Sequence, residues 1–345
     1  MYNVSVSPHI RTQDSTKTIM GDVCIALIPV LAFGFYHFGL PALLVTLLCV
    51  ASSVLFELLF ELAAKRPITI FDNSAVVTGL ILAINLPASV PWYIPVLGSA
   101  FAIIIVKMLF GGLGQNFMNP ALGARCFLLI SFASRMSDFA TYGVYSAGFS
   151  ELFKDGKIKD CLLLLAGKTD GVADAVAGAT PLVQLGEGKE LDLLSLFLGM
   201  HGGTIGEVSA LAILIGAAYL IIKKVISIRI PATYIISTVA FVAIIRFIQG
   251  DEITVNYLVG QVLSGGLLIG AFFMATDYVT SPITPKGQIL YGVALGFATA
   301  MFRVVGSSAE GVSYAIIICN LLVPVIEKIT VPKPFGSVKA KGDVH

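Results

Sequence analysis

The chain has 345 residues, of which 57% are hydrophobic and only 12% are charged. Soluble domains are about a quarter charged, so this composition excludes an ordinary soluble protein and predicts an all-α polytopic membrane protein that lies in a lipid bilayer. The net charge is +1. A near-neutral chain gives no indication of a nucleic-acid partner.

Hydrophobic segments predict about ten transmembrane helices, because a span needs roughly 20 apolar residues and fewer where it is broken. The segments are 20–38, 40–64, 74–86, 93–110, 121–134, 204–222, 230–249, 257–276, 287–305 and 311–328. Segments 74–86 and 121–134 are short and lie beside Pro and Gly clusters, which predicts that these helices are broken. A broken helix is tolerated in a membrane where its freed backbone faces protein or a water-lined cavity.

The two halves of the chain contain a weak internal repeat. The stretches "GLILAINLP" (79–87) and "GAFFMATDYVTSP" (270–282) both run from Gly through apolar residues to a polar residue, Asn85 or Asp277, and then to proline. Five spans separate the two copies, and an odd number inverts the second copy in the membrane. Inverted repeats with broken helices are typical of transporters and channels. Two apolar blocks also resemble each other by chance, and both explanations stay open here.

The distribution of Lys and Arg predicts that both termini are cytoplasmic, since cytoplasmic loops are enriched in these residues. In this orientation the short outer loops contain no Lys or Arg, and the long loop lies outside. The predicted order is a cytoplasmic N-terminal segment (1–19), a first five-helix repeat (20–134), an extracytoplasmic loop (135–190), a second five-helix repeat (191–329) and a cytoplasmic tail (330–345).

The stretch "GGLGQNFMNPALGARC" (111–126) has two compatible interpretations. It can be a helix break in which Asn119 is the N-cap and Pro120 occupies the first helical position. It can also be an ion or cofactor site at that helix N-terminus, where free N–H groups favour an anion. No strand is expected before the motif, which excludes a dinucleotide-binding fingerprint, and the four scattered histidines predict no metal site.

Charged residues near the predicted span ends are further candidates. Glu57 and Glu61 lie one helical turn apart, and Lys65 follows Glu61 at i+4, which favours a plain surface ion pair. Other charged side chains at span ends are expected to extend to the membrane interface; they are Asp22, Lys107, Arg125 and Arg303. Asp277 is the best candidate for an ion path, because it follows a continuous apolar run and precedes a proline-broken loop.

The long outer loop contains the stretch "DAVAGATP" (174–181), in which Thr180 follows small residues. Pro181 biases Thr180 toward an extended backbone, which presents its side chain. One interpretation is a modification site, since a hydroxyl among small residues is open to an enzyme. The other is a plain exposed turn with a helix cap, and nothing in these residues excludes it.

Four motifs together resemble one family: "SPHIRTQDSTKTIMGDV", "GGLGQNFMNPALGARCF", "FMATDYVTSPITPKGQILYG" and "DAVAGATPL". The chain is similar to the RnfD/NqrB family, which comprises the RnfD membrane protein of the Rnf complex and its homologue NqrB in the sodium-pumping NADH:quinone oxidoreductase. The resemblance covers nearly the whole chain, and the length favours the Rnf type. It implies a urea-channel-like fold of two inverted five-helix repeats in the plasma membrane of a bacterium or archaeon.

The resemblance also implies flavin cofactors. In this family the last threonine of an Asp-x-x-Ser/Thr-Gly-Ala-Thr motif carries FMN through a phosphoester bond that a flavin transferase installs. The matching residues are Asp174, Gly178, Ala179 and Thr180, whereas Ala177 stands where the family has Ser or Thr. A second, non-covalent flavin, riboflavin, is implied in the membrane part.

The function implied is that of a membrane electron-transfer subunit in a complex that couples ferredoxin:NAD⁺ oxidoreduction to Na⁺ or H⁺ translocation. The implied partners are the other Rnf subunits (C, G, E, A and B), and this chain alone would hold no complete active site. Two alternatives remain at this point. One is a solute channel or secondary transporter of the same inverted-repeat fold, and the other is the NqrB-like component of a Na⁺-translocating NADH:quinone reductase.

Overall fold

The computed structural model describes residues 15–142, 165–167, 175–177, 180–186, 188, 191–199, 201–306 and 311–332. The first half contains α1 (Thr16–Phe38), α2 (Leu40–Ala63), η1 (Ile70–Asp72), α3 (Ser74–Ile84), α4 (Tyr93–Ala100), η2 (Phe101–Met108), α5 (Pro120–Ser131) and α6 (Ala133–Met136). The second half contains α8 (Pro181–Gly186), α9 (Leu193–Leu198), α10 (Ala210–Ile222), α11 (Arg229–Gln249), α12 (Val255–Leu263), α13 (Leu267–Ile269), η5 (Gly270–Met274), α14 (Pro285–Ala300), η6 (Met301–Val305) and α15 (Gly311–Thr330). Between the halves, the short strands β1 (Ala140–Tyr142) and β2 (Ala175–Ala177) pair in antiparallel fashion, a small addition to the predicted all-α fold.

Five helices are long and apolar enough to cross a membrane: α1, α2, α11, the continuous α14–η6 and α15. Helix α12 and the segment α13–η5 form one bent span, with an angle of 56° between its parts. Four shorter apolar helices are α3, α4–η2, α5 and α10. Each predicted hydrophobic segment therefore contains a helix, and α3 and α5 are short as the sequence indicated. The described chain is a polytopic helical membrane protein.

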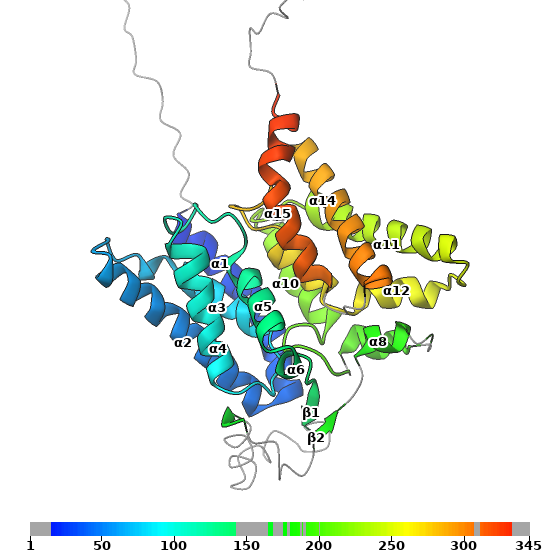
Figure 1. Cartoon of the computed structure of the whole chain (residues 1–345), viewed down its shortest axis with the longest axis horizontal. Coiled ribbons are helices and arrows are strands. Elements are labelled where there is room, and N and C mark those ends of the chain that lie inside the picture. Colours follow the sequence, from blue (N-terminus) through cyan, green and yellow to red (C-terminus); the bar gives the residue numbers. More distant parts are fainter. Residues whose placement is uncertain are drawn as a thin grey trace, which may run out of the picture.

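The helices place the chain ends and the central connection at opposite ends of the molecule. Figure 1 shows the start of α1 and the end of α15 at one end, from which the grey traces leave. The strands β1 and β2, together with α6 and α8, lie at the other end. The segment that carries Thr180 is therefore separated from both helical termini by the thickness of the helix bundle.

Side-chain caps define where the helices start. The Ser15 hydroxyl accepts from the Thr18 N–H at 3.2 Å, and the Thr18 hydroxyl accepts from the Ser15 N–H at 2.8 Å, so α1 begins with a capping box. Helix α1 ends at Gly39, whose φ of 71° lies in the region that favours glycine. Pro41 near the start of α2 then begins the return across the bundle.

Small residues bring the helices of the second half close together. A Cβ added to Gly292 or Gly296 of α14 would collide with Thr233 or Ser237 of α11. A Cβ on Gly216 of α10 would collide with the Ala26 carbonyl oxygen of α1, which joins the second half to the first. Close packing through glycine is a main source of helix association in membranes, where helices gain nothing from leaving water.

The two halves share an uncommon local structure. In each half an α-helix continues into a π-helix that contains a cation, Lys107 in η2 and Arg303 in η6. In each half a residue with left-handed backbone precedes the short third helix, Asn73 (φ 65°) before α3 and Gly266 (φ 67°) before α13. π-Helices are rare, so their occurrence at matching positions goes beyond a general likeness of apolar blocks.

Each of these cations binds the start of the neighbouring broken helix. The Lys107 Nζ donates to the Ser74 hydroxyl at 2.7 Å. The Arg303 Nη2 donates to the carbonyl oxygens of Ser264 and Gly265 at 3.0 and 2.9 Å. These donors satisfy polar groups that a broken helix would otherwise leave unpaired inside the membrane. The expectation that both side chains simply extend to the interface is therefore wrong.

Candidate functional site

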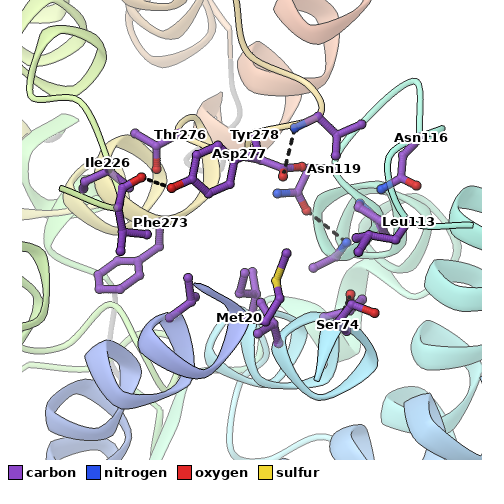
Figure 2. A pocket seen from close by; sticks show the side chains of 18 of the residues that line it. Met20, Ser74, Leu113, Asn116, Asn119, Ile226, Phe273, Thr276, Asp277 and Tyr278 are labelled. Atoms are coloured by element: carbon purple, nitrogen blue, oxygen red, sulfur yellow. Dashed lines mark hydrogen bonds between the residues drawn. The ribbon is translucent and has the colours of Figure 1, made fainter. Parts of the chain in front are cut away.

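A cavity of about 80 Å³ lies between the two halves, at the broken helices. Met20 of α1 and Ser74 of α3 line one side, and Asn119, Asp277 and Tyr278 line the other (Figure 2). A buried water needs roughly 10–15 Å³ of such space, so the cavity can hold several waters or a partly hydrated ion. Its lining from both halves places it where inverted-repeat transporters bind their substrates.

Asn119 connects the halves at this cavity. Its Oδ1 accepts from the N–H groups of Ala121 and Leu122 at 3.1 and 3.3 Å, and Pro120 occupies the first position of α5. The predicted cap is therefore confirmed. The Asn119 Nδ2 also donates to the Met274 carbonyl oxygen at 3.5 Å, at the end of η5. One side chain thus fixes a helix start in the first half to a helix end in the second.

Asp277 lines the cavity from the segment that follows η5. Its side chain accepts from the Val279 N–H at 3.5 Å and from the Thr280 hydroxyl at 3.2 Å. Beside it, the Tyr278 hydroxyl donates to the Val225 carbonyl oxygen, which ties this segment to the end of α10 (Figure 2). Asp277 is half-buried and faces the cavity, so it stands where an ion-path residue would be needed.

A buried ion pair reaches the same cavity and was missed by sequence reasoning. The Lys107 Nζ lies 2.7 Å from the Glu57 Oε1, and the two side chains are 2% and 1% exposed. Glu61 is buried as well, and its Oε1 accepts from the Thr69 N–H and hydroxyl at 3.0 and 2.5 Å. The expected surface pair of Glu61 with Lys65 is wrong, because α2 ends at Ala63 and Lys65 has a left-handed backbone (φ 51°).

One face of α2 carries a column of oxygens without partners. The Ser53 Oγ, the Glu57 Oε2 and the Glu61 Oε2 are all buried, and none has a hydrogen-bond partner among the described residues. The three residues are spaced four apart, so they lie above one another on the helix. Buried oxygens without partners are costly, which indicates waters or a cation along this column. The i+4 spacing of Ser and Glu was the signal available in the sequence.

Arg125 is a further buried cation whose expected extension to the interface is wrong. It is 4% exposed, and its Nη1 donates to the Asn85 Oδ1 at 2.6 Å. The Asn85 Nδ2 in turn donates to the Ile81 carbonyl oxygen at 2.6 Å. The polar residue that ends the first repeat motif thus holds a charge of α5 inside the protein.

Removal of the Asn85 side chain is expected to destabilise the fold through this cation. In Asn85→Ala the buried Arg125 guanidinium loses a charge-assisted hydrogen bond, so we expect the free energy of unfolding to fall by about 1.5–3 kcal/mol. Thermal unfolding of the purified chain in detergent measures this loss. Ser195→Ala, which removes an exposed side-chain bond to Asp192, is the control and should leave the melting temperature within error.

Thr180 lies at the start of α8, at the end of the molecule opposite the chain termini. Its side chain is 9% exposed, and its Oγ1 has no hydrogen-bond partner among the described residues. The expectation of an open hydroxyl is wrong for this arrangement, because α8 packs on α12. The other residues of the expected attachment motif, Asp174, Gly178 and Ala179, lie outside the described residues.

The two implied flavins fit these surroundings differently. An esterified Thr180 oxygen has no proton to donate, so a buried Oγ1 without a partner is compatible with a phosphoester. The cavity at Asp277, with about 80 Å³, is smaller than the roughly 300–1,000 Å³ of usual ligand sites, and it does not fit a riboflavin as it stands.

Comparison with known proteins gives one consistent result. The profile of the NQR2, RnfD, RnfE family matches residues 3–336. Three relatives are membrane-complex components that each carry the letter D in their complex. The chain is 45% identical to that of the Na⁺-translocating ferredoxin:NAD⁺ oxidoreductase complex of Acetobacterium woodii, over 98% of this chain and 96% of that protein. It is 38% identical to that of the proton-translocating ferredoxin:NAD⁺ oxidoreductase complex of Clostridium ljungdahlii, over 98% and 97%. It is 37% identical to that of the ion-translocating oxidoreductase complex of Stutzerimonas stutzeri, over 94% and 93%.

Proposed function

This chain belongs to the NQR2, RnfD, RnfE family, and on that premise we propose that it is the RnfD-type electron-transfer protein of an ion-translocating ferredoxin:NAD⁺ oxidoreductase complex in the membrane. Its relatives couple to Na⁺ in one case and to protons in another, so either ion suits the proposal. Ferredoxin and NAD⁺ would bind the partner subunits, and this chain would carry electrons on a flavin that its own residues hold and orient.

The proposed electron carrier is FMN, joined to Thr180 through a phosphoester bond by a flavin transferase. The observation that supports it is the buried Thr180 Oγ1 without a partner among the described residues, at the start of α8. A free buried hydroxyl in that position leaves a donor unsatisfied, whereas an ester oxygen does not. The phosphate would also lie at a helix start that Pro181 leaves without one N–H.

Loss of the Thr180 hydroxyl should abolish covalent flavin. The chain is co-expressed with a flavin transferase, denatured and examined by in-gel flavin fluorescence and intact mass, and we expect an FMN adduct on the native chain and none on Thr180→Ala. Thr254→Ala is the matched control, because Thr254 also begins a helix at its N-cap and should leave the adduct unchanged. An adduct that persists in Thr180→Ala would exclude this attachment site.

The proposed membrane topology has two inverted five-helix repeats, with both termini in the cytoplasm of a bacterium or archaeon and residues 135–190 outside. The π-helix cations and the left-handed residues before α3 and α13 support the repeat. The opposite placement of the α1 start and of β1–β2 supports the topology (Figure 1). A reporter fused at about residue 160 should be active only outside the cytoplasm, and activity inside would reverse the orientation.

A second candidate function is ion passage through this chain itself. The oxygen column of Ser53, Glu57 and Glu61 favours it, together with Asp277 at the cavity. Carboxylate and hydroxyl oxygens are the ligands that Na⁺ and water-borne protons would need to cross an apolar interior. Within the complex this path would serve coupled translocation, and in isolation it would make the chain a channel of the same fold.

Neutralising Glu61 tests ion passage. In Glu61→Gln we expect Na⁺ uptake by proteoliposomes of the whole complex to fall by at least about tenfold, which corresponds to a loss of about 1.4 kcal/mol of ion stabilisation. Glu252→Gln, an exposed acid at the opposite end, is the control and should transport normally. Uptake by the isolated chain without reductant would favour a channel, and unchanged uptake in Glu61→Gln would exclude the column.

A further inference from the structure

Helix α8 is held on the second half by two leucines. Leu182 is 8% exposed and Leu185 is 2% exposed. A Cβ added to Gly260 of α12 would lie 2.9 Å from the Leu185 Cδ1, and a Cβ on Gly265 would lie 3.0 Å from the Leu182 Cδ2. Both leucines therefore fill space that two glycines leave open. We call this contact surface of Gly260 and Gly265 the α8 seat.

The α8 seat is rigid on the side away from α8. The Arg303 Nη1 donates to the Gln261 carbonyl oxygen at 2.6 Å, and its Nη2 donates to the carbonyl oxygens of Ser264 and Gly265 at 3.0 and 2.9 Å. These bonds close the break between α12 and α13, where Gly265 and Gly266 both have positive φ. The seat thus keeps its shape whether or not α8 lies on it.

Helix α8 itself is a weak element away from the seat. It has six residues, and helices this short are not stable alone in water, so its form depends on packing. Its first turn is held by the Thr180 carbonyl oxygen, which accepts from the Val183 and Gln184 N–H groups at 3.0 and 3.1 Å. Thr180 therefore moves with α8, and its hydroxyl is covered while the leucines stay seated.

We propose that α8 is a releasable cover that must leave the α8 seat before Thr180 can be modified, and that its return fixes the position of the attached group. This inference rests on the proposed attachment of FMN at Thr180. A transferase active site must reach the hydroxyl oxygen, and a side chain 9% exposed does not offer that access. Leu182 and Leu185 are then positioning residues, which act on the flavin through the helix that carries it.

The attachment step balances as a phosphoryl transfer from a flavin dinucleotide. The Thr180 Oγ1 forms a bond to the flavin-side phosphorus while the phosphoanhydride bond breaks. The leaving nucleoside monophosphate takes the electron pair, and the hydroxyl proton passes to a base of the transferase. Nothing is oxidised or reduced. Only the transferase, the donor and an exposed hydroxyl are needed, so exposure of Thr180 is the contribution of this chain.

A crosslink between α8 and its seat tests the cover. In a Cys161→Ser background, Leu185→Cys is combined with Gly260→Cys, which removes the leucine methyl groups that a Gly260 Cβ would meet. The full-length unmodified chain is purified in detergent, oxidised or kept reduced, and given transferase and flavin dinucleotide. Adduct formation is followed by intact mass. We expect the crosslinked form to react at least about tenfold more slowly than the reduced form, because the reactive fraction is lost.

A second variant opens the cover without changing α8. Gly260→Val fills the space of Leu185 and should raise the initial rate of flavin attachment above that of the native chain. Gly186→Ala, at a glycine with nothing within 4 Å of an added Cβ, is the control and should react at the native rate. Equal rates in the crosslinked and reduced forms would overturn the cover alone. Absence of any adduct on the native and reduced chains would overturn both the cover and the proposed attachment of FMN.

Discussion

Replacing Lys107 with methionine is expected to lower the free energy of unfolding by about 3–5 kcal/mol, because it leaves the charge of a buried partner uncompensated. The partner is Glu57, which is 0% exposed and whose Oε2 already lacks a hydrogen bond among the described residues. Lys107→Met also removes the donor to the Ser74 hydroxyl at the start of α3. Thermal and denaturant unfolding of the purified chain in detergent measures the loss.

The double variant separates the ion pair from simple packing. When Glu57→Leu is combined with Lys107→Met, no charge remains buried, and stability should return to near the native value, since well-packed apolar residues commonly replace such a pair without loss. Lys65→Met, an exposed lysine beyond the end of α2, is the surface control and should be neutral. If the single and double variants were equally unstable, the loss would come from the shape of the methionine and not from the uncompensated charge.

Gly296→Val is expected to destabilise the second half by about 1–3 kcal/mol or more, because it inserts atoms into a contact without free space. An added Cβ at this position would lie 2.6 Å from the backbone nitrogen of Thr238 and would also meet the Ser237 hydroxyl. Neither can yield without moving α11, since the nitrogen belongs to the helix backbone. The expected result is a lower melting temperature in detergent and a reduced amount of folded chain in membranes.

The matched control for this change is Gly21→Val in α1. It has the same helix propensity cost, but an added Cβ at Gly21 meets nothing within 4 Å. We expect Gly21→Val to change stability by only the few tenths of a kcal/mol that separate a β-branched residue from glycine's own weak propensity. An equal loss in both variants would mean that helix propensity, and not the α11–α14 contact, decides the outcome.

The helices themselves follow from local properties of the sequence and were predictable. Apolar runs located every helical segment, and the Asn119–Pro120 pair located the start of α5. The likeness of Asn85 and Asp277 located the two helix ends at which Arg125 is bound and the cavity is lined. The family also followed from motifs that together span almost the whole chain.

The buried contacts were not predictable, because they join residues that are distant in the sequence. Lys107 and Glu57 are 50 residues apart and meet only when η2 packs beside α2. The left-handed backbone of Lys65 removed the i+4 pair that helical spacing indicated. The burial of Thr180 depends on Gly260, which lies on a helix that begins far beyond α8. Each error has the same physical cause: tertiary packing overrode a local pattern.

The π-helices have a consequence for how such chains tolerate insertions and deletions. Hydrogen bonds from the N–H of Leu109 to Ile104 and from the N–H of Gly306 to Met301 span five residues, one more than in an α-helix. Each residue in η2 and η6 therefore turns through a smaller angle than helical-wheel counting assumes. A deletion of one residue within 101–108 would restore α-geometry and rotate Lys107 away from Glu57 toward lipid. The position of the charge is thus encoded in the length of the segment as much as in the residue that carries it.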